Sequence, residues 1–401
     1  MTSHLLTSLS PGDVKEKMSS LSSQLQSSFN SITHDLPKPV DVLNIAKNLK
    51  SSSSVPAESK TVPEKKNSNS SGFSDYRLAQ FEQILQTDNI DSTALRKLSW
   101  NGVPSKHRSL VWQILLGYAP TNRLRRQEIL RKKRKEYLNM VNVYYDVPDE
   151  DRTAHELEIK RQILKDIPRT CPDSPFFQQG PIQLMMERIL YVWSVRHPAS
   201  GYVQGMDDLL TPMLYLSLSA HAPNQDVFRT DTQRLEKQIL LDIEADSYWC
   251  FTKLLDNIQD HYTFSQPGLQ RMLLRLEDLI VRLDSQLSSH FQAQSIQYIQ
   301  FGFRWMNCLL LRELPFDCIL RLWDTYISEQ SGGFENFHVY VCAVVLKTFQ
   351  PDLLQLNTYE DLLIFLQDLP TKDWKEEAME SILSQAFILS TLFDSSPSHL
   401  G

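Results

Sequence analysis

The chain has 401 residues, of which 22% are charged and 41% are hydrophobic, and its formal net charge is −7. No stretch approaches the roughly 20 consecutive apolar residues of a membrane-spanning helix, and the start does not resemble a secretion signal, so we expect a soluble cytoplasmic protein. The acidic balance argues against a nucleic-acid binder, and five scattered cysteines without a CxxC pair predict neither disulfides nor a zinc site.

Residues 1–75 contain 19 serines and none of the seven tryptophans, a composition that cannot bury enough apolar surface to offset chain entropy. We therefore expect a disordered tail followed by one helical domain over about 76–395. Within the tail, residues 13–36 carry an apolar stripe at helical spacing opposite a serine and glutamine face. This stripe predicts an amphipathic helix that contacts membranes, with a partner-binding helix or plain coil as the alternatives.

Only 12 glycines interrupt the chain, and apolar residues recur at helical spacing between proline and glycine positions, which predicts an all-α fold. Between residues 123 and 135 there are eight basic side chains and one acidic one, Glu128. A solvated helix face explains this run better than a nuclear signal or a lipid patch. The periodic segments predict helices over 104–117, 155–166, 182–196, 247–258, 268–288, 291–313, 315–329, 334–349 and 359–368.

Two polar loops flank the predicted helix over 182–196. Pro168 disfavours the α conformation at Ile167, so the preceding helix should end there and leave Arg169 on a loop. After the helix, a turn carries Tyr202 and Gln204. The 167–180 connection is long enough for Arg169 to approach Gln204, and such a pair could bind an anion but could not act as a base or nucleophile. The alternative for an isolated loop arginine is a salt bridge or a helix cap.

At these positions the sequence resembles the TBC domain, the GTPase-activating module for Rab proteins. Ile163-x-x-Asp166-x-x-Arg169 matches its IxxDxxR signature, and Tyr202-x-Gln204 matches its YxQ signature. The resemblance covers about 95–350 and implies an all-α, multi-helix, V-shaped domain. The supporting pieces, in the family's order, are Gly102-Val103-Pro104, Arg108-x-x-x-Trp112, Gln204-Gly205-Met206 and Leu322-Trp323-Asp324.

The resemblance also implies site roles. Arg169 would enter the nucleotide site of the Rab as an arginine finger, and Gln204 would orient the attacking water in place of the GTPase's own glutamine. Asp166 would orient the guanidinium and Tyr202 would support the glutamine loop or contact the Rab, although both could be purely structural. GTP and Mg²⁺ would belong to the partner Rab in its GTP form, so no cofactor or metal site is expected in this chain.

The remaining motif positions are expected to support these loops. Arg108 and Trp112 share one helix face and could brace the catalytic loops. Ile163 and Gly205 belong to the two signatures themselves. The neighbouring pair Asp207-Asp208 fits a helix N-terminus better than a metal site, because no ligand set completes it.

Residues 244–251 resemble Golgi-associated members of the family, which suggests a location at Golgi or vesicle membranes, with Golgi adaptor proteins as further partners. The leading interpretation is a Rab GTPase-activating protein. The alternative is a catalytically weak adaptor or scaffold that uses the TBC fold only to bind Rabs or Golgi partners. The presence of both Arg169 and Gln204 favours the activator.

Overall fold

The computed structural model describes residues 70–221, 227–330 and 332–394. Contacts along the chain separate residues up to Ser74 from a compact unit that runs from Asp75 to Gly401. The predicted tail helix over 13–36 lies outside the described residues. The described residues form helices and turns without a β-strand. One isolated β-bridge joins Asn89 to Asn122. The all-α prediction is therefore confirmed. None of the described helices is long and apolar enough to cross a membrane.

The described part of the chain is built from α-helices. The first eight are α3 (Ser70–Leu85), α4 (Ser92–Ser99), α5 (Ser105–Leu115), α6 (Arg123–Met140), α7 (Ala154–Asp166), α8 (Gly180–Arg196), α9 (Met206–Ser219) and α10 (Lys237–Asn257). The others are α11 (Pro267–Leu283), α12 (Ser285–Ala293), α13 (Ile299–Asn307), α14 (Phe316–Ser328), α15 (His338–Thr348), α16 (Gln350–Leu353), α17 (Tyr359–Gln367) and α18 (Glu376–Asp394).

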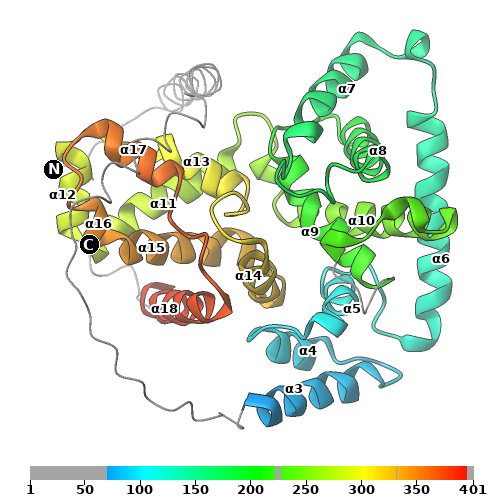
Figure 1. The fold of residues 1–401 in the computed structure, drawn as a ribbon, viewed down its shortest axis with the longest axis horizontal. Helices are drawn as coiled ribbons and strands as arrows, with labels where there is room; N and C mark the ends of the chain where they lie inside the picture. The colour runs from blue at the N-terminus through cyan, green and yellow to red at the C-terminus, as the bar shows by residue number, and fades with distance from the viewer. Residues whose placement is uncertain (1–69, 222–226, 331, 395–401) are drawn as a thin grey trace, which may run out of the picture. The chain divides into compact units, whose positions relative to one another are not determined.

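Two groups of helices pack within the compact unit (Figure 1). In the first group α10 contacts α6, α8 and α9, and α7 packs on α8. In the second group α11 contacts α13 and α15, and α15 packs on α18. Helix α14 touches α4, α5 and α18, so it connects the N-terminal helices to the second group. Buried apolar side chains run through both groups as one contiguous core.

Local signals explain why α7 and α8 match their predicted positions. Thr153 and Glu156 form a reciprocal capping box at the start of α7, which satisfies two otherwise unpaired backbone N–H groups. Helix α8 begins with a proline in its first turn and ends at His197, whose backbone leaves the helical region just before Pro198. The proline and His197 thus define the two ends of α8, the helix that separates the two polar loops.

The predicted helix over 268–288 is wrong as a single element, because the chain breaks at Asp284. This residue has φ −152° and ψ 78°, and its carboxylate accepts a hydrogen bond from the backbone N–H of Leu287 at 3.0 Å. An aspartate that caps the next helix outweighs the continuous apolar pattern. The break separates α11 from α12.

The prediction of one helix over 291–313 is also wrong. Helix α12 ends at Ala293, and Ser295 adopts the left-handed conformation with φ 59°. After α13 the chain turns again, with φ values of 50° at Leu309 and 63° at Leu310. Tertiary packing imposes these turns, since leucine has no local preference for positive φ. They aim the segment after α13 towards the loop that carries Gln204.

A buried carboxylate fastens α5 to α14. Asp324 accepts hydrogen bonds from the indole N–H of Trp112 at 2.7 Å and from the backbone N–H of Val103 at 2.8 Å. Its two oxygens also receive the guanidinium of Arg108, with Nε at 3.1 Å from each. Burial raises the pKa of Asp324, while Arg108 and the hydrogen bonds oppose that shift. The carboxylate thereby satisfies three donor residues from 103–112 and joins that stretch to α14.

Replacing Asp324 should therefore be strongly destabilising. Asp324→Ala leaves the buried Arg108 cation without its partner, which costs about 3–5 kcal/mol of unfolding free energy. Urea denaturation measures the change. The matched control is Asp278→Ala, which removes an exposed ion pair with Arg282 and should cost under about 1 kcal/mol. Equal losses in the two variants would contradict the role of Asp324.

A second buried polar group makes stability depend on pH. His338 lies at the start of α15, with Nδ1 2.7 Å from the hydroxyl of Tyr326 and Nε2 3.0 Å from the carbonyl oxygen of Trp305. Its Nε2 also lies near the thiol of Cys342, and the ring of His261 is close enough to act electrostatically. Burial lowers the pKa of His338 to about 3, so the native fold holds a neutral imidazole.

Because the unfolded chain binds this proton near pH 6.5, the stabilising contribution of His338 is complete above that pH and is lost as the pH falls towards 3. At pH 5 the loss should reach about 2 kcal/mol. Urea denaturation between pH 7 and pH 5 measures it. His338→Gln, which cannot titrate, should make this slope shallower, and the remaining slope belongs in part to His261, where burial lowers the pKa to about 4. The control is His155→Gln on the exposed side of α7. An unchanged slope in His338→Gln would refute the assignment.

Candidate functional site

Arg169 lies in a short 3₁₀ turn, Ile167–Arg169, that directly follows α7. The α-helix ends at Asp166 as the proline predicts, but Ile167 keeps a right-handed helical conformation with φ −49° and ψ −49°. The expectation that Pro168 would move Ile167 out of the helical region is thus wrong. A proline fits the first positions of a new helical turn, where its missing N–H is not needed. Arg169 therefore has a more defined backbone than a loop would provide.

The side chain of Arg169 is 63% exposed, yet its direction is fixed. Nε donates to the carbonyl oxygen of Lys165 at 2.9 Å, and Nη2 lies 2.5 Å from a carboxylate oxygen of Asp166. Asp166 itself is buried, and burial raises its pKa, with the charge of Asp207 adding to the shift. One edge of the guanidinium is thus attached to a buried acid while the rest reaches solvent.

Gln204 sits in the turn before α9, and its backbone is held by the second helix group. Asn307, the last residue of α13, donates from Nδ2 to the carbonyl oxygen of Gln204 at 2.9 Å. The following residue, Gly205, has φ +101°, and a Cβ there would lie only 2.4 Å from Asn307 Nδ2. Both the left-handed backbone and this close approach require glycine. The Gln204 side chain itself is partly exposed.

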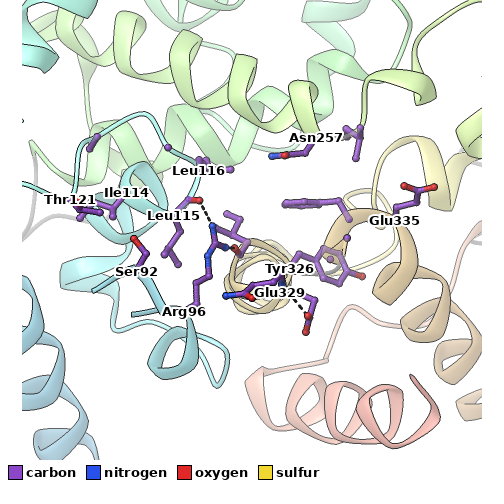
Figure 2. Close-up of a pocket in the computed structure, with 18 of the residues that line it drawn as sticks. Ser92, Arg96, Ile114, Leu115, Leu116, Thr121, Asn257, Tyr326, Glu329 and Glu335 are labelled. Atoms are coloured by element: carbon purple, nitrogen blue, oxygen red, sulfur yellow. Dashed lines mark hydrogen bonds between the residues drawn. The ribbon is translucent and has the colours of Figure 1, made fainter. Parts of the chain in front are cut away.

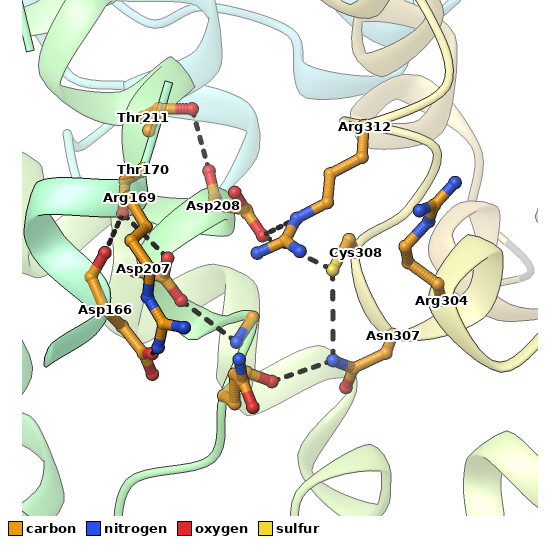
Figure 3. A network of polar contacts seen from close by, with 12 residues as sticks. Asp166, Arg169, Thr170, Asp207, Asp208, Thr211, Arg304, Asn307, Cys308 and Arg312 are labelled. Atoms are coloured by element: carbon orange, nitrogen blue, oxygen red, sulfur yellow. Dashed lines mark hydrogen bonds and ion pairs between the residues drawn. The ribbon is translucent and has the colours of Figure 1, made fainter. Parts of the chain in front are cut away.

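Asp207 connects the arginine loop to the glutamine loop. Its carboxylate accepts from the hydroxyl of Thr170 at 2.7 Å and from the backbone N–H of Gly205 at 2.9 Å (Figure 3). The Tyr202 hydroxyl lies 2.8 Å from Asp166 and 3.2 Å from Asp207. Burial and these two carboxylates raise the pKa of Tyr202, so the phenol keeps the proton that it shares between them. The structure thus brings Asp166, Arg169, Tyr202 and Gln204 into one hydrogen-bonded region.

The sequence analysis placed Asp207 and Asp208 only at a helix N-terminus, which is where they lie, and missed what they bind. Asp208 accepts from Arg312 Nε at 2.7 Å, and the Cys308 thiol lies 3.5 Å from the same oxygen. Burial raises the pKa of Asp208 and the adjacent Asp207 adds to it, while Arg312 opposes the shift. Figure 3 shows Arg312 and Asn307 reaching the site from the side opposite to Arg169.

Other predicted residues lie outside this network. Ile163 lies on the inner face of α7, where it is fully buried in the core. Arg108 and Trp112 bind Asp324, as described above, so their polar groups brace the contact between α5 and α14. Their predicted supporting role is therefore indirect.

One hollow among the described residues adjoins the arginine loop. It has a volume of about 380 Å³ and is lined mainly by apolar side chains, among them Cys171, Pro172, Phe177 and Phe316. A larger hollow, of about 760 Å³, lies between α4, α5 and α14 (Figure 2). Arg96 in its wall donates to the carbonyl oxygens of Leu115 and Ile327. This arginine therefore connects α4 to α5 and α14. None of the predicted site residues lines the larger hollow.

Comparison with known proteins identifies the domain to which these helices belong. Residues 105–354 match the Rab-GTPase-TBC domain. The chain is 47% identical over 323 residues to human TBC1 domain family member 22B, covering 80% of this chain and 63% of that protein. It is 45% identical over 328 residues to the GTPase-activating protein gyp1 of Schizosaccharomyces pombe, covering 81% and 63%. The chain thus spans a little under two thirds of the length of these relatives.

Among solved structures, the Ypt/Rab-GAP domain of Gyp1p superimposes with a TM-score of 0.76 at 42% identity, covering 80% of this chain and 99% of that domain. The flagellar RabGAP TBC domain of Chlamydomonas has a TM-score of 0.56 at 18% identity, which supports the fold alone. The family model, the sequence identity and the fold all agree, and the chain belongs to the Rab-GTPase-TBC domain family.

Proposed function

We propose that this protein is a GTPase-activating protein for a Rab-family GTPase in its GTP form. The observation that carries the proposal is the exposed guanidinium of Arg169, oriented by buried Asp166 on a turn that is hydrogen-bonded to the Gln204 loop. The names of its relatives point the same way, since gyp1 is called a GTPase-activating protein and the matched domain of Gyp1p a Ypt/Rab-GAP domain.

In the proposed reaction the GTPase supplies GTP and Mg²⁺, and this chain supplies two polar side chains. Negative charge on the transferring phosphoryl group must be stabilised, and a planar guanidinium suits that task because it donates along fixed directions. An arginine finger accelerates hydrolysis by about 10³–10⁵, or roughly 4–7 kcal/mol. The exposed side chain of Arg169 can provide this contact without unfolding its own turn.

Gln204 would hold the attacking water in line with the γ-phosphate. An amide neither gains nor loses a proton near neutral pH, but it can accept one hydrogen bond and donate another, which is enough to orient a water molecule. Gly205 and Asn307 fix the backbone of this residue and leave its side chain for the partner. The activator would thereby replace the glutamine that some GTPases provide themselves.

The proposal extends to location and partners. Rab activators act on lipid-anchored GTPases, so the protein would work from the cytoplasm at Golgi or vesicle membranes. Residues 13–36 and Golgi adaptor proteins would supply further contacts. The likeness of residues 244–251 to Golgi-associated family members supports this location. A panel of purified Rabs tests the proposal: binding without stimulated GTP hydrolysis would favour the adaptor alternative.

Arg169→Ala and Arg169→Lys should each reduce stimulated hydrolysis by at least about 10³, because the lost contact belongs to the transition state. Single-turnover GTP hydrolysis on the best Rab of the panel measures the effect. Arg161→Ala and Arg161→Lys are the matched controls, since Arg161 is an exposed arginine on α7 that pairs with Glu158. Activity within about threefold of wild type in both Arg169 variants would exclude the arginine finger.

Gln204→Ala should also lose most of the stimulation, by about 10² or more, while the fold is retained. The fold should persist because Asn307 binds the main-chain oxygen, which alanine keeps. A Rab whose own switch glutamine is changed to alanine should still respond to the wild-type protein. Gln162→Ala on α7 serves as the control. The two-residue mechanism fails if the Rab variant becomes unresponsive while Gln204→Ala stays active.

A further inference from the structure

The outward face of α6 carries a concentration of positive charge in a chain whose net charge is −7. At 100° per residue, Leu124, Arg125, Arg131, Lys132 and Lys135 share an arc about 120° wide, and all five are exposed. We call these five residues the basic face. Glu128 is the one acidic residue within the arc. Helix α6 lies at the edge of the first helix group, with its other side along α10 (Figure 1).

The basic residues of α6 divide into two sets with different surroundings. Those on the inner side belong to the fold: Arg134 binds Asp242 and Asp246, and Arg126 donates to the carbonyl oxygens of Pro120 and Thr121. The second set consists of the four cations of the basic face. Their side chains form no hydrogen bond or ion pair with any residue that the structure describes. The packing of α6 thus explains the first set and leaves the second unexplained.

Helix stability does not account for the basic face either. The N-terminus of a helix has a partial positive charge, so acidic side chains are favoured in its first turn. The first turn of α6 contains no acidic residue, and Arg125 of the basic face stands there instead. This cation repels the positive end of the helix dipole, so it does not stabilise the helix. A negatively charged ligand that binds outside the fold explains its presence better.

The layout of the basic face indicates the kind of ligand. Arg125 and Lys135 are ten residues apart, or about 15 Å along the helix axis, which is too far for a single phosphate group to contact both. No carboxylate of the described residues holds the four cationic side chains in one geometry. They can therefore follow an extended surface that carries many separate negative charges. Leu124 is 76% exposed on the same face, where it can enter the outer layer of a bilayer.

The sequence alone favoured a merely solvated face for this run, but the separation of paired from unpaired cations changes that interpretation: we propose that the basic face of α6 binds membranes that contain anionic lipids. Clusters of about four to eight Lys and Arg side chains on one helix are typical of binding to anionic lipids, and each cation contributes several-fold to the membrane partition coefficient. An acidic protein surface would fit less well, since protein interfaces are usually anchored by buried aromatic or arginine side chains in pockets. The face differs from the tail segment 13–36, whose apolar stripe offers little charge.

The test compares the full chain with a variant that combines Arg125→Gln, Arg131→Gln, Lys132→Gln and Lys135→Gln. Flotation uses vesicles of phosphatidylcholine alone and of phosphatidylcholine with phosphatidylserine. Wild type should partition onto the anionic vesicles at least about tenfold more than the variant does. Raising the salt from about 0.1 M to about 1 M shortens the Debye length from about 10 Å to about 3 Å and should abolish the difference.

A matched control removes the same amount of charge from exposed lysines elsewhere. It combines Lys97→Gln, Lys237→Gln, Lys372→Gln and Lys375→Gln. This control should bind anionic vesicles within about twofold of wild type if position on the basic face matters. Any lipid contact by residues 13–36 is present in all three proteins, so it cancels from the comparison.

Three outcomes would overturn the proposal. Equal loss of binding in the control and in the basic-face variant would show an effect of net charge alone, and wild-type binding by the basic-face variant would exclude the face. Stimulated hydrolysis of a soluble Rab without vesicles provides a separate measurement. The activity of the basic-face variant in this assay should stay within about twofold of wild type, because the basic face lies apart from Arg169 and Gln204. A large loss there would assign the face to a protein partner and refute the lipid proposal.

Discussion

The carboxylate of Asp207 is the contact on which the candidate site depends. It receives the hydroxyl of Thr170 from one loop and the backbone N–H of Gly205 from the other, and both groups are buried with it. A buried carboxylate without hydrogen-bond donors would raise the free energy of the folded state, so the two loops are held together whenever the domain is folded. In the proposed reaction, the backbones that carry Arg169 and Gln204 would therefore be held in place before a GTPase binds, which would lower the entropic cost of positioning the two side chains.

Neighbouring negative charges explain why cations converge on this region from two directions. Asp166, Asp207 and Asp208 are all buried, and their mutual repulsion favours any arrangement that brings positive charge close. Arg169 approaches Asp166 from the 3₁₀ turn after α7, and Arg312 approaches Asp208 from the segment after α13. The second ion pair, together with Asn307, joins α9 to the second helix group. The same carboxylates thus orient the exposed arginine and hold the two groups of helices at the glutamine loop.

Sequence reasoning located helix ends where the signals are local, because prolines mark the end of α7 and both ends of α8. The spacing of the two signatures gives Arg169 and Gln204 as candidates, and their roles stay a prediction. Sequence reasoning failed where partners are remote in the chain. Asn307 lies 103 residues from Gln204, and no local pattern at either position indicates their contact. The breaks at Asp284 and Ser295 were missed for a related reason, because an apolar stripe continues across them while caps and packing decide the backbone.

The contacts of Arg169 also explain why lysine would be a poor substitute in the proposed reaction. Nε and Nη2 are already engaged by the Lys165 carbonyl and by Asp166, and Nη1 has no hydrogen bond to any residue that the structure describes. The guanidinium can therefore keep its attachment to the buried acid while a second edge meets a phosphate oxygen. A lysine has one nitrogen for both tasks. If it turned to the phosphate, Asp166 would lose its cation beside Asp207, and that repulsion would oppose the transition state that the arginine stabilises.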